Sequence, residues 1–404
     1  MFDYVQNGLF HKSQCIFQTK HDVVKHDESI GLMNYLPDSI ILEIFNHLNV
    51  QDLGIAAGVC QRWYILAHDP ILRHVLNVTF VRLTGLQIWR LFHLQAASCV
   101  REVHLLGQFT CSGYHHGNCV TAGHSISPSL TSFTLPELSV RCPNLHSLFL
   151  SDMCLAFNTN GSVVTLNDFP PSLRRLGIRS SLLHIQKFFT DDPEQVLPDL
   201  VYLDVGLCNL MNTNALERLS SWGSSLHALG LERCTRIGDD SLERVPELLQ
   251  SLVVLDLEGT GVSEEGFGRL LRTATNLQQL YVGQSKFAGQ SLHLMKLGSL
   301  PKLRRICLRD TEVNADTILR LVKVAQNLEV IYLSTGALVE GCAPNACFSS
   351  CKIVVSGVLE TKTCGHFLSS GVRQVGLSSE RRKRSEGRLE SKDEQAVVQL
   401  VSSY

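Results

Sequence analysis

Five cysteine and histidine side chains near the end of the chain are the first place where this sequence could do chemistry. Thiolates and imidazoles are the side chains that zinc prefers. Their spacing, C-x4-C-x3-C-x12-C-x-H, matches no standard zinc pattern, so we interpret them as the unpaired thiols of a chain end. The residues are Cys342, Cys347, Cys351, Cys364 and His366.

A second group of metal-ligating side chains lies in a stretch rich in Gly, Ser and His between residues 107 and 129. It consists of His115, His116, Cys119 and His124. Their composition would suit a metal ion, but a polar loop or insertion is the better interpretation of such a segment. We therefore predict no metal and no cofactor.

Catalytic motifs are absent from the sequence. It contains no G-x-S-x-G, Walker loop, H-E-x-x-H or paired-carboxylate motif where a fold would support it. We expect no catalytic residues and no enzyme activity in this chain.

Composition narrows the partners and the compartment. Of the 404 residues, 44% are hydrophobic and 18% charged, and the formal net charge is -2, so neither nucleic acid nor an anionic membrane is favoured. The 14 cysteines lack the spacing of a secreted disulfide scaffold, which favours a reducing compartment. With no apolar window suited to a signal peptide or a membrane span, we expect a cytoplasmic or nuclear protein.

A repeated pattern, L-x-x-L-x-L, must position whatever this chain binds. The middle residues of eight copies are separated by steps of 28, 27, 26, 26, 25, 26 and 25 residues, within the range of leucine-rich repeats. A weaker ninth copy, centred on Val103, precedes them. The eight middle residues are Leu148, Leu176, Leu203, Leu229, Leu255, Leu280, Ile306 and Ile331.

Each repeat predicts a strand, a turn and a returning helix. Alternating residues such as Leu229 and Leu231 place two side chains on one face of a short strand. Three positions later stands a small, weakly polar residue that can bond to the turn while buried, and an apolar helical pattern follows. One unit cannot bury its own apolar face, but stacked units can, so we predict a curved α/β solenoid with strands on the concave side. The turn residues are Cys208, Cys234, Thr260, Ser285 and Thr311.

Three short helices are expected before the repeats. Pro37 and Asp38 start the first, which carries Ile41, Ile44, Phe45 and Leu48 at i, i+3, i+4 and i+7. Asp52 is a suitable N-cap for a second helix, and a third would carry Trp63 and end at Asp69-Pro70. About forty residues form only a marginal core, which should lean on a partner.

This segment resembles the F-box. The matching residues are Leu36-Pro37, Ile44-Phe45, Leu48, Asp52-Leu53, Val59-Cys60, Trp63, Leu66, Asp69 and Leu72, and one departure is Arg73, where the family often has Trp. Likewise, Cys234 to Leu242 resembles the cysteine-containing subclass of leucine-rich repeats that occurs largely in F-box proteins. Together these features identify the chain as similar to the F-box and leucine-rich-repeat family over roughly residues 34 to 356.

The resemblance implies a substrate-recognition subunit of an SCF-type ubiquitin ligase. In that family the F-box binds a Skp-type adaptor, which joins a cullin scaffold and a RING subunit, while the repeats bind a protein substrate for ubiquitination and degradation. Catalysis would belong to those partners. The carried-over adaptor-binding candidates are Leu36, Pro37, Ile41, Ile44, Leu48, Leu53, Val59, Cys60 and Trp63, whereas we expect Phe45 and Leu66 to be core.

The concave side of the strands is the candidate substrate surface. Residues that alternate with the buried pair point to it. They predict a central acidic group flanked by basic and aromatic side chains, suited to a basic or mixed-charge segment, although such charges are often merely solvated. The candidates are Arg175, Asp204, Glu232, Asp256, Glu258, Tyr281, Arg305, Arg309 and Tyr332, with Arg179 beside Arg175.

These observations predict four parts. Residues 1–33 are a disordered N-terminal extension, 34–80 the F-box, 98–356 the leucine-rich repeats and 357–404 a disordered charged tail. The tail contains the basic run Arg381-Arg-Lys-Arg384, a weak candidate for a nuclear import signal.

The main rival hypothesis is a ligase-independent binding scaffold, in which the helical motif only caps the solenoid. A cap would need a polar outer face.

Overall fold

The computed structural model describes residues 32–48, 50–92, 97–108, 130, 134–155, 163–189, 197–208, 210–220, 225–334 and 351–356. Several sequence-based expectations lie outside these ranges. They are the N-terminal extension up to residue 31, the histidine-rich insertion from 109 to 129, the charged tail with its basic run, and the terminal cysteine–histidine group other than Cys351.

The N-terminal segment folds as short helices whose starts are visible in the sequence. Cys60 caps the third, because its Sγ accepts a hydrogen bond from the Trp63 amide at 3.4 Å, and Asp69 caps the turn that follows it. The second helix begins at Val50, so Asp52 lies inside it and the predicted N-cap at Asp52 is wrong. The elements are η1 (Leu32–Tyr35), α2 (Asp38–Asn46), α3 (Val50–Ala57), α4 (Gln61–Ala67) and η2 (Pro70–Arg73).

A small apolar core holds these helices together. Ile41, Phe45, Ala56 and Leu66 are buried in it, and the Phe45 ring meets the Trp63 ring edge-on at 5.2 Å between centroids. The expected core roles of Phe45 and Leu66 are confirmed. With so few buried side chains, this unit depends on each large one.

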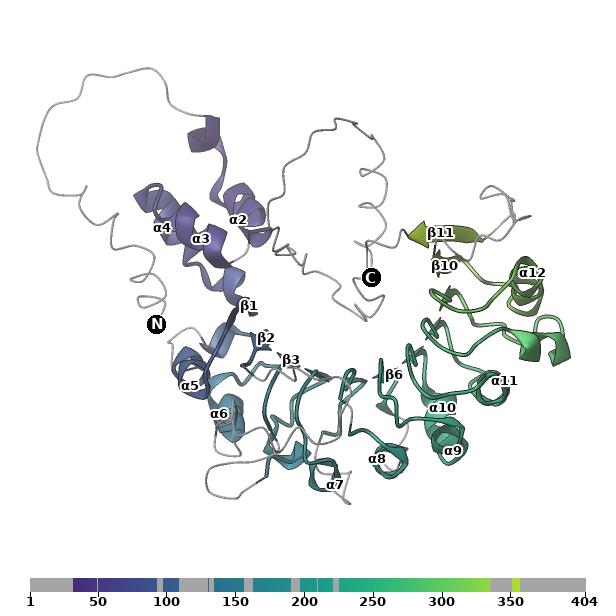
Figure 1. The fold of residues 1–404 in the computed structure, drawn as a ribbon. Coiled ribbons are helices and arrows are strands. Elements are labelled where there is room, and N and C mark those ends of the chain that lie inside the picture. Colours follow the sequence, from purple (N-terminus) through teal and green to yellow (C-terminus); the bar gives the residue numbers. More distant parts are fainter. Residues whose placement is uncertain are drawn as a thin grey trace, which may run out of the picture.

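A single parallel sheet runs through the rest of the described chain. Its strands lie side by side in sequence order, each hydrogen-bonded to the next, and Figure 1 shows them following one long arc. The eight predicted copies are β3 to β10, and the weaker ninth copy is β2, so the predicted solenoid is confirmed. The strands are β1 (Val75–Arg82), β2 (Glu102–Leu106), β3 (Ser147–Ser151), β4 (Arg175–Arg179), β5 (Tyr202–Asp204), β6 (Ala228–Gly230), β7 (Val254–Asp256), β8 (Gln279–Tyr281), β9 (Arg305–Cys307), β10 (Val330–Ser334) and β11 (Lys352–Ser356).

Helices cover the outer side of this arc, and the strands line its inner side (Figure 1). One continuous core of leucines, isoleucines, valines and phenylalanines fills the space between the two layers. The helices are α5 (Gly85–Phe92), α6 (Thr134–Arg141), α7 (Ile185–Phe188), α8 (Thr213–Ser220), α9 (Asp239–Glu243), α10 (Pro246–Ser251), α11 (Glu264–Thr273) and α12 (Ala315–Val324). Single turns of 3-10 helix are η3 (Ala97–Cys99), η4 (Leu166–Asp168) and η6 (Gln290–Leu294).

The sheet begins before the first predicted repeat at residue 98. Strand β1 pairs in parallel with β2, with Val75 opposite Glu102. The sheet therefore starts inside the range 34–80 that was assigned to the helical domain, and the F-box helices run directly into the solenoid. No L-x-x-L-x-L copy marks this strand, which is why the repeat pattern did not reveal it.

The turn after each strand repeats one backbone geometry. The small polar side chain in the turn bonds a backbone carbonyl while shielded from water: Cys234 Sγ lies 3.4 Å from the Val205 oxygen, and Thr260 Oγ1 lies 2.7 Å from the Leu257 oxygen. This was the predicted role of the position, and it is confirmed. The preceding residue has a left-handed backbone in seven turns, at Asp152, Ser180, Leu207, Arg233, Gly259, Gln284 and Asp310.

No helix in the described part of the chain has the length and apolarity that a membrane crossing requires.

Candidate adaptor and substrate surfaces

The helical domain exposes apolar side chains that its own core does not use. Val59 is 58% exposed, and Pro37, Ile44 and Cys60 also lie at the surface. These four candidates are placed where a partner can touch them. Exposed isoleucine and valine cost free energy in water, at about 25 cal/mol per Å² of apolar surface, so a partner that covers them gains affinity.

The remaining adaptor candidates lie at or in the core. Ile41 is fully buried, so it can shape the surface but cannot touch a partner. The other four are half-buried and pack against the core, with one side left toward solvent. They are Leu36, Leu48, Leu53 and Trp63.

Four exposed apolar residues of α2, α3 and α4 were not among the candidates. Ile40 and Ile55 are 47% and 65% exposed, and Tyr64 and Ile65 lie at the surface of α4. The sequence does carry a signal for them, because each stands close to a core residue of the same helix. A helix of this size can bury only one face, so an apolar neighbour of a core residue must be exposed.

Arg62 fixes the start of the first helix. Its guanidinium donates to Asp38 Oδ1 at 2.6 Å and to the backbone oxygen of Leu36 at 2.5 Å. Because Pro37 lies between these two residues, the bonds hold the Leu36-Pro37 step in one conformation. A preformed step loses less entropy when a partner binds it.

On the concave side, the strand register brings the acidic candidates together. Asp204 lies opposite Gly230, and Gly230 lies opposite Asp256. Glu232 and Glu258 follow two residues after Gly230 and Asp256, so they occupy the next row. The predicted acidic centre is therefore assembled from β5, β6, β7 and the turns that follow them.

These four carboxyl groups are buried, with exposed fractions between 0% and 3%. The expectation that charges on this face are merely solvated is therefore wrong for the acidic centre. Glycines are the physical reason for two of them, because Asp204 lies over Gly206 and Gly230, and Glu258 lies over Gly283. A Cβ on Gly230 would lie 2.7 Å from Asp204 Oδ1.

Arg179 neutralises one half of the acidic centre. Its guanidinium donates to both oxygens of Asp204, at 2.8 and 3.1 Å, and to Glu232 Oε2. Burial alone would lower the pKa of Arg179, but the two carboxylates raise it well above its usual value. The sequence suggested that Arg179 flanks the acidic centre. In the structure it is instead a permanent cation inside that centre.

The other half has no such cation. Burial, with the nearby Glu232 and Glu258, raises the pKa of Asp256 well above its usual value. Burial and Glu232 raise the pKa of Glu258 to about 7, against the opposing effect of Arg309. Glu258 is therefore poised to hold a proton near neutral pH in the absence of a cation.

An aromatic group lies at the N-terminal side of the acidic centre. The rings of His104 and Phe149 stack at 4.6 Å, and the Arg175 guanidinium lies 5.1 Å from the Phe149 ring centre and 5.7 Å from that of Tyr202. Glu102 bonds His104 at 2.6 Å. Glu102 and His104 were not among the candidates, although the ninth repeat copy would have placed them in this row.

At the C-terminal side the candidates Tyr281, Arg305, Arg309 and Tyr332 are half-buried on the same face. Arg309 lies 5.8 Å from the ring centre of Tyr332, which is within cation–π range. The structure thus brings all nine concave candidates onto one face, in the predicted order of acidic centre and flanks.

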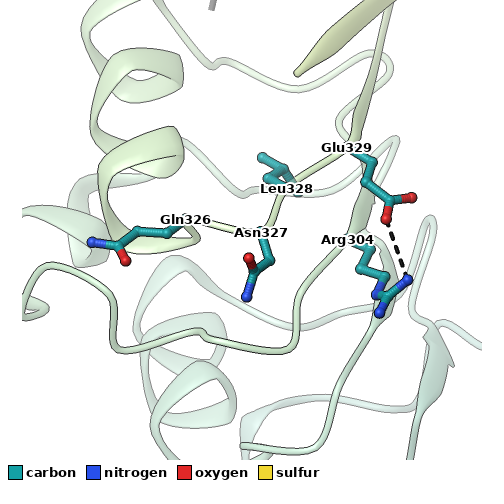
Figure 2. A pocket seen from close by; sticks show the side chains of 5 residues that line it. All are labelled: Arg304, Gln326, Asn327, Leu328 and Glu329. Atoms are coloured by element: carbon teal, nitrogen blue, oxygen red, sulfur yellow. Dashed lines mark hydrogen bonds and ion pairs between the residues drawn. The ribbon is translucent and has the colours of Figure 1, made fainter. Parts of the chain in front are cut away.

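A pocket of about 270 Å³ lies away from this face, where the chain enters β9 and β10. Figure 2 shows its side chains and the ion pair between Arg304 and Glu329, at 3.3 Å. Two amides and one leucine complete the lining. The pair is exposed and the lining offers no nucleophile, so this pocket suggests no reaction. No cluster of His, Cys, Asp or Glu with metal-binding geometry occurs among the residues that the structure describes.

Comparison with known proteins agrees with both parts of the molecule. Residues 33–78 match the family model described as F-box-like. The human F-box/LRR-repeat protein 12 is 26% identical over 275 residues, which cover 68% of this chain and 78% of that protein. The mouse protein of the same name is 26% identical over 285 residues, covering 70% and 80%.

Among solved structures, an internalin C2 from Listeria monocytogenes aligns with a TM-score of 0.32 and 20% identity, over 50% of this chain and 78% of that one. That likeness is too low to support an argument, and the fold rests on the strands described above. The chain thus combines an F-box-like domain with a leucine-rich-repeat solenoid, which is the arrangement of the F-box and leucine-rich-repeat proteins.

Proposed function

We propose that this protein is the substrate-recognition subunit of an SCF-type ubiquitin ligase. Its F-box-like domain binds a Skp-type adaptor, and through the adaptor it joins a cullin scaffold and a RING subunit. The concave face of the repeats binds the protein substrate. The chain itself contributes binding and positioning, and its partners supply the chemistry of ubiquitin transfer.

One observation carries this proposal over the rival scaffold. A solenoid cap needs a polar outer face, whereas α2, α3 and the turn after α3 expose Ile40, Ile44, Ile55 and Val59. Apolar exposure of this kind, next to a preformed Leu36-Pro37 step, is typical of a surface that a partner covers. The match of residues 33–78 to the F-box-like model supports an adaptor as that partner.

The compartment of the proposed ligase is the cytoplasm or the nucleus. The cysteines in the described ranges are free thiols, several of them buried. Burial raises the pKa of Cys208 to about 12, which keeps it a structural thiol rather than a reactive one. Reduced thiols of this kind persist in those compartments.

Direct binding to a purified Skp-type adaptor tests the proposal. Val59→Glu and Ile55→Glu place a charge on the exposed apolar surface, so we expect each to weaken adaptor binding at least tenfold in calorimetry. Val140→Glu is the matched control, because Val140 is a similarly exposed apolar residue on α6. If the first two variants bind the adaptor as tightly as Val140→Glu does, these residues do not form the adaptor surface.

A further inference from the structure

The acidic centre contains three carboxyl oxygens without a hydrogen-bond partner. They are Glu232 Oε1, Asp256 Oδ2 and Glu258 Oε2, and all three lie out of contact with solvent. A buried polar atom without a partner destabilises the folded state, and more so when it is charged. Native proteins keep few such atoms, so three in one place need an explanation.

The other oxygens of these acids are already used by the protein. Glu232 Oε2 accepts from Arg179, and Asp256 Oδ1 accepts from the Glu258 amide at 2.9 Å. Asp204 is satisfied fully, by Arg179, Tyr202 and the Gly206 amide. Each of the three oxygens therefore lacks a donor. Because the three acids are close enough to raise one another's pKa, the donor best suited to them is a cation.

We propose that these three carboxyl groups form a cation subsite for an arginine or lysine side chain of the captured substrate, which would make a basic segment the class of substrate. This inference rests on the proposed function, because it assigns the concave face to substrate. A guanidinium or ammonium offers five or three N–H donors, enough to satisfy the three oxygens.

The surroundings of the subsite suit such a side chain. Gly283 places no side chain over Glu258, since a Cβ on Gly283 would lie 3.1 Å from Glu258 Cδ. An apolar group lies on the same face, on β3 and on β5 to β8, where the methylene stem of lysine or arginine can rest. It comprises Tyr202, Ala228, Val254, Tyr281 and Phe149.

Arg179 binds the other oxygen of Glu232, and the two arginines that act on Glu258 have other partners. Arg233 and Arg309 lower the pKa of Glu258 from a distance, while Glu232 and Asp310 raise it. The Arg233 guanidinium donates to Gln284 at 2.8 Å, and that of Arg309 lies over Tyr332. Because a bound cation favours the ionised acids, we expect affinity for a basic peptide to rise between pH 6 and pH 8 as Glu258 loses its proton.

Fluorescence anisotropy with the full chain tests the subsite. The probe is a labelled twelve-residue peptide with four arginines spaced by Gly and Ser, beside the same peptide with citrulline, which keeps the shape without the charge. The test variant is Glu232→Gln/Asp256→Asn/Glu258→Gln. Its control is Glu217→Gln/Glu243→Gln/Glu329→Gln, which removes three acids on the outside of the solenoid and so changes the net charge equally.

We expect wild type and control to bind the arginine peptide at least tenfold more tightly than the citrulline peptide, and the test variant to lose that preference. The single variant Glu258→Gln, which leaves the Arg179–Glu232 ion pair in place, should show the same loss and should melt no lower than wild type. Equal arginine-peptide binding by test and control variants would overturn the subsite, and so would equal binding of the two peptides by wild type.

Measuring adaptor binding by the same variants distinguishes failure of the cation subsite from failure of the proposed function. The test variant should bind the adaptor as wild type does, since its substitutions lie on β6, β7 and their turns. Loss of peptide binding with the adaptor retained supports the subsite. A wild-type chain that binds the arginine peptide and no adaptor would contradict the proposed function, because only the cation subsite would then have been observed.

Discussion

At the scale of single residues, the turns of this solenoid impose a conformation that most side chains disfavour. Leu207 has a φ of 61° and Arg233 a φ of 54°, while Gly259 occupies the same place with a φ of 64°. The left-handed region costs a residue with a Cβ about 1 kcal/mol or more. The turn holds because the amide of each residue bonds the next repeat, as Leu207 N does to the Glu232 oxygen at 2.7 Å.

We therefore predict that Leu207→Gly is more stable than Leu207→Ala by about 1 kcal/mol, because both lose the same packing but only glycine relieves the turn. Urea denaturation measures the difference. At Arg272, in helix α11, the order should reverse, with Ala about 1 kcal/mol more stable than Gly. If Ala is the more stable residue at both positions, the turn stores no strain.

Glu258 gives a prediction about pH. Its pKa is about 7 in the fold against an ordinary value of 4.5, so the folded state holds the proton longer than the unfolded chain does. Stability then falls as pH rises from about 4.5 to 7, by up to about 1.4 kcal/mol per pH unit. Glu258→Gln should flatten this fall and raise the stability at pH 8 by roughly 2 kcal/mol.

Denaturation of wild type and Glu258→Gln at pH 5 and pH 8 makes the comparison. Glu329→Gln, an exposed acid paired with Arg304, is the control and should leave the pH dependence unchanged. A Glu258→Gln variant with the same stability difference between the two pH values as wild type would show that Glu258 ionises normally.

At the scale of elements, the strands of the repeats and the helices of the N-terminal domain could be predicted from the sequence. Strand β1 could not. A 25- to 28-residue period fixes each repeat strand because its leucines must face the core, and β3 to β10 follow it. Strand β1 lacks the L-x-x-L-x-L pattern of the repeats, and its place in the sheet is defined by its pairing with β2. Long-range pairing of this kind leaves no local signal in a sequence.

The candidate site divides in the same way. Alternation along a strand predicted which side chains share the concave face, since it depends only on the strand geometry. Burial of Asp256 and Glu258 could not be predicted, because it depends on glycines of neighbouring repeats across the register. The same limit applies to Arg179, whose two carboxylate partners come from different strands.

The small helical domain should depend on Phe45, which is buried and packs on Trp63. Phe45→Ala removes the largest side chain of a four-residue core and should cost about 3–5 kcal/mol, enough to unfold the domain. Limited proteolysis should then cut within residues 32–73 while the repeats stay intact. Val59→Ala, at an exposed site, should resist cleavage as wild type does. Equal resistance of Phe45→Ala would show that the core lies elsewhere.

At the scale of the whole molecule, each repeat of the solenoid contacts mainly the repeats before and after it. Each strand pairs only with the strands before and after it, so stability is approximately a sum of repeats and of the contacts between them. The concave surface inherits this property, because the acidic centre is shared by three consecutive strands. Damage to one repeat should therefore stay near it.

Leu255, buried in β7 at the centre of the arc, offers the test. Leu255→Ala should cost about 2–5 kcal/mol through the cavity it leaves. Hydrogen exchange should accelerate most in β6, β7 and β8 and least in β2 and β10. Uniform acceleration across all strands would show that the repeats unfold as one unit instead.

The central claim is that the F-box-like domain joins this chain to a ubiquitin ligase, and affinity capture from cells tests it most directly. Wild type should retain both the Skp-type adaptor and the cullin, and Leu36→Ala/Pro37→Ala should lose both, because the two side chains that Arg62 holds in position are removed. If neither version retains the adaptor, the helices are only a cap and the protein is a repeat scaffold.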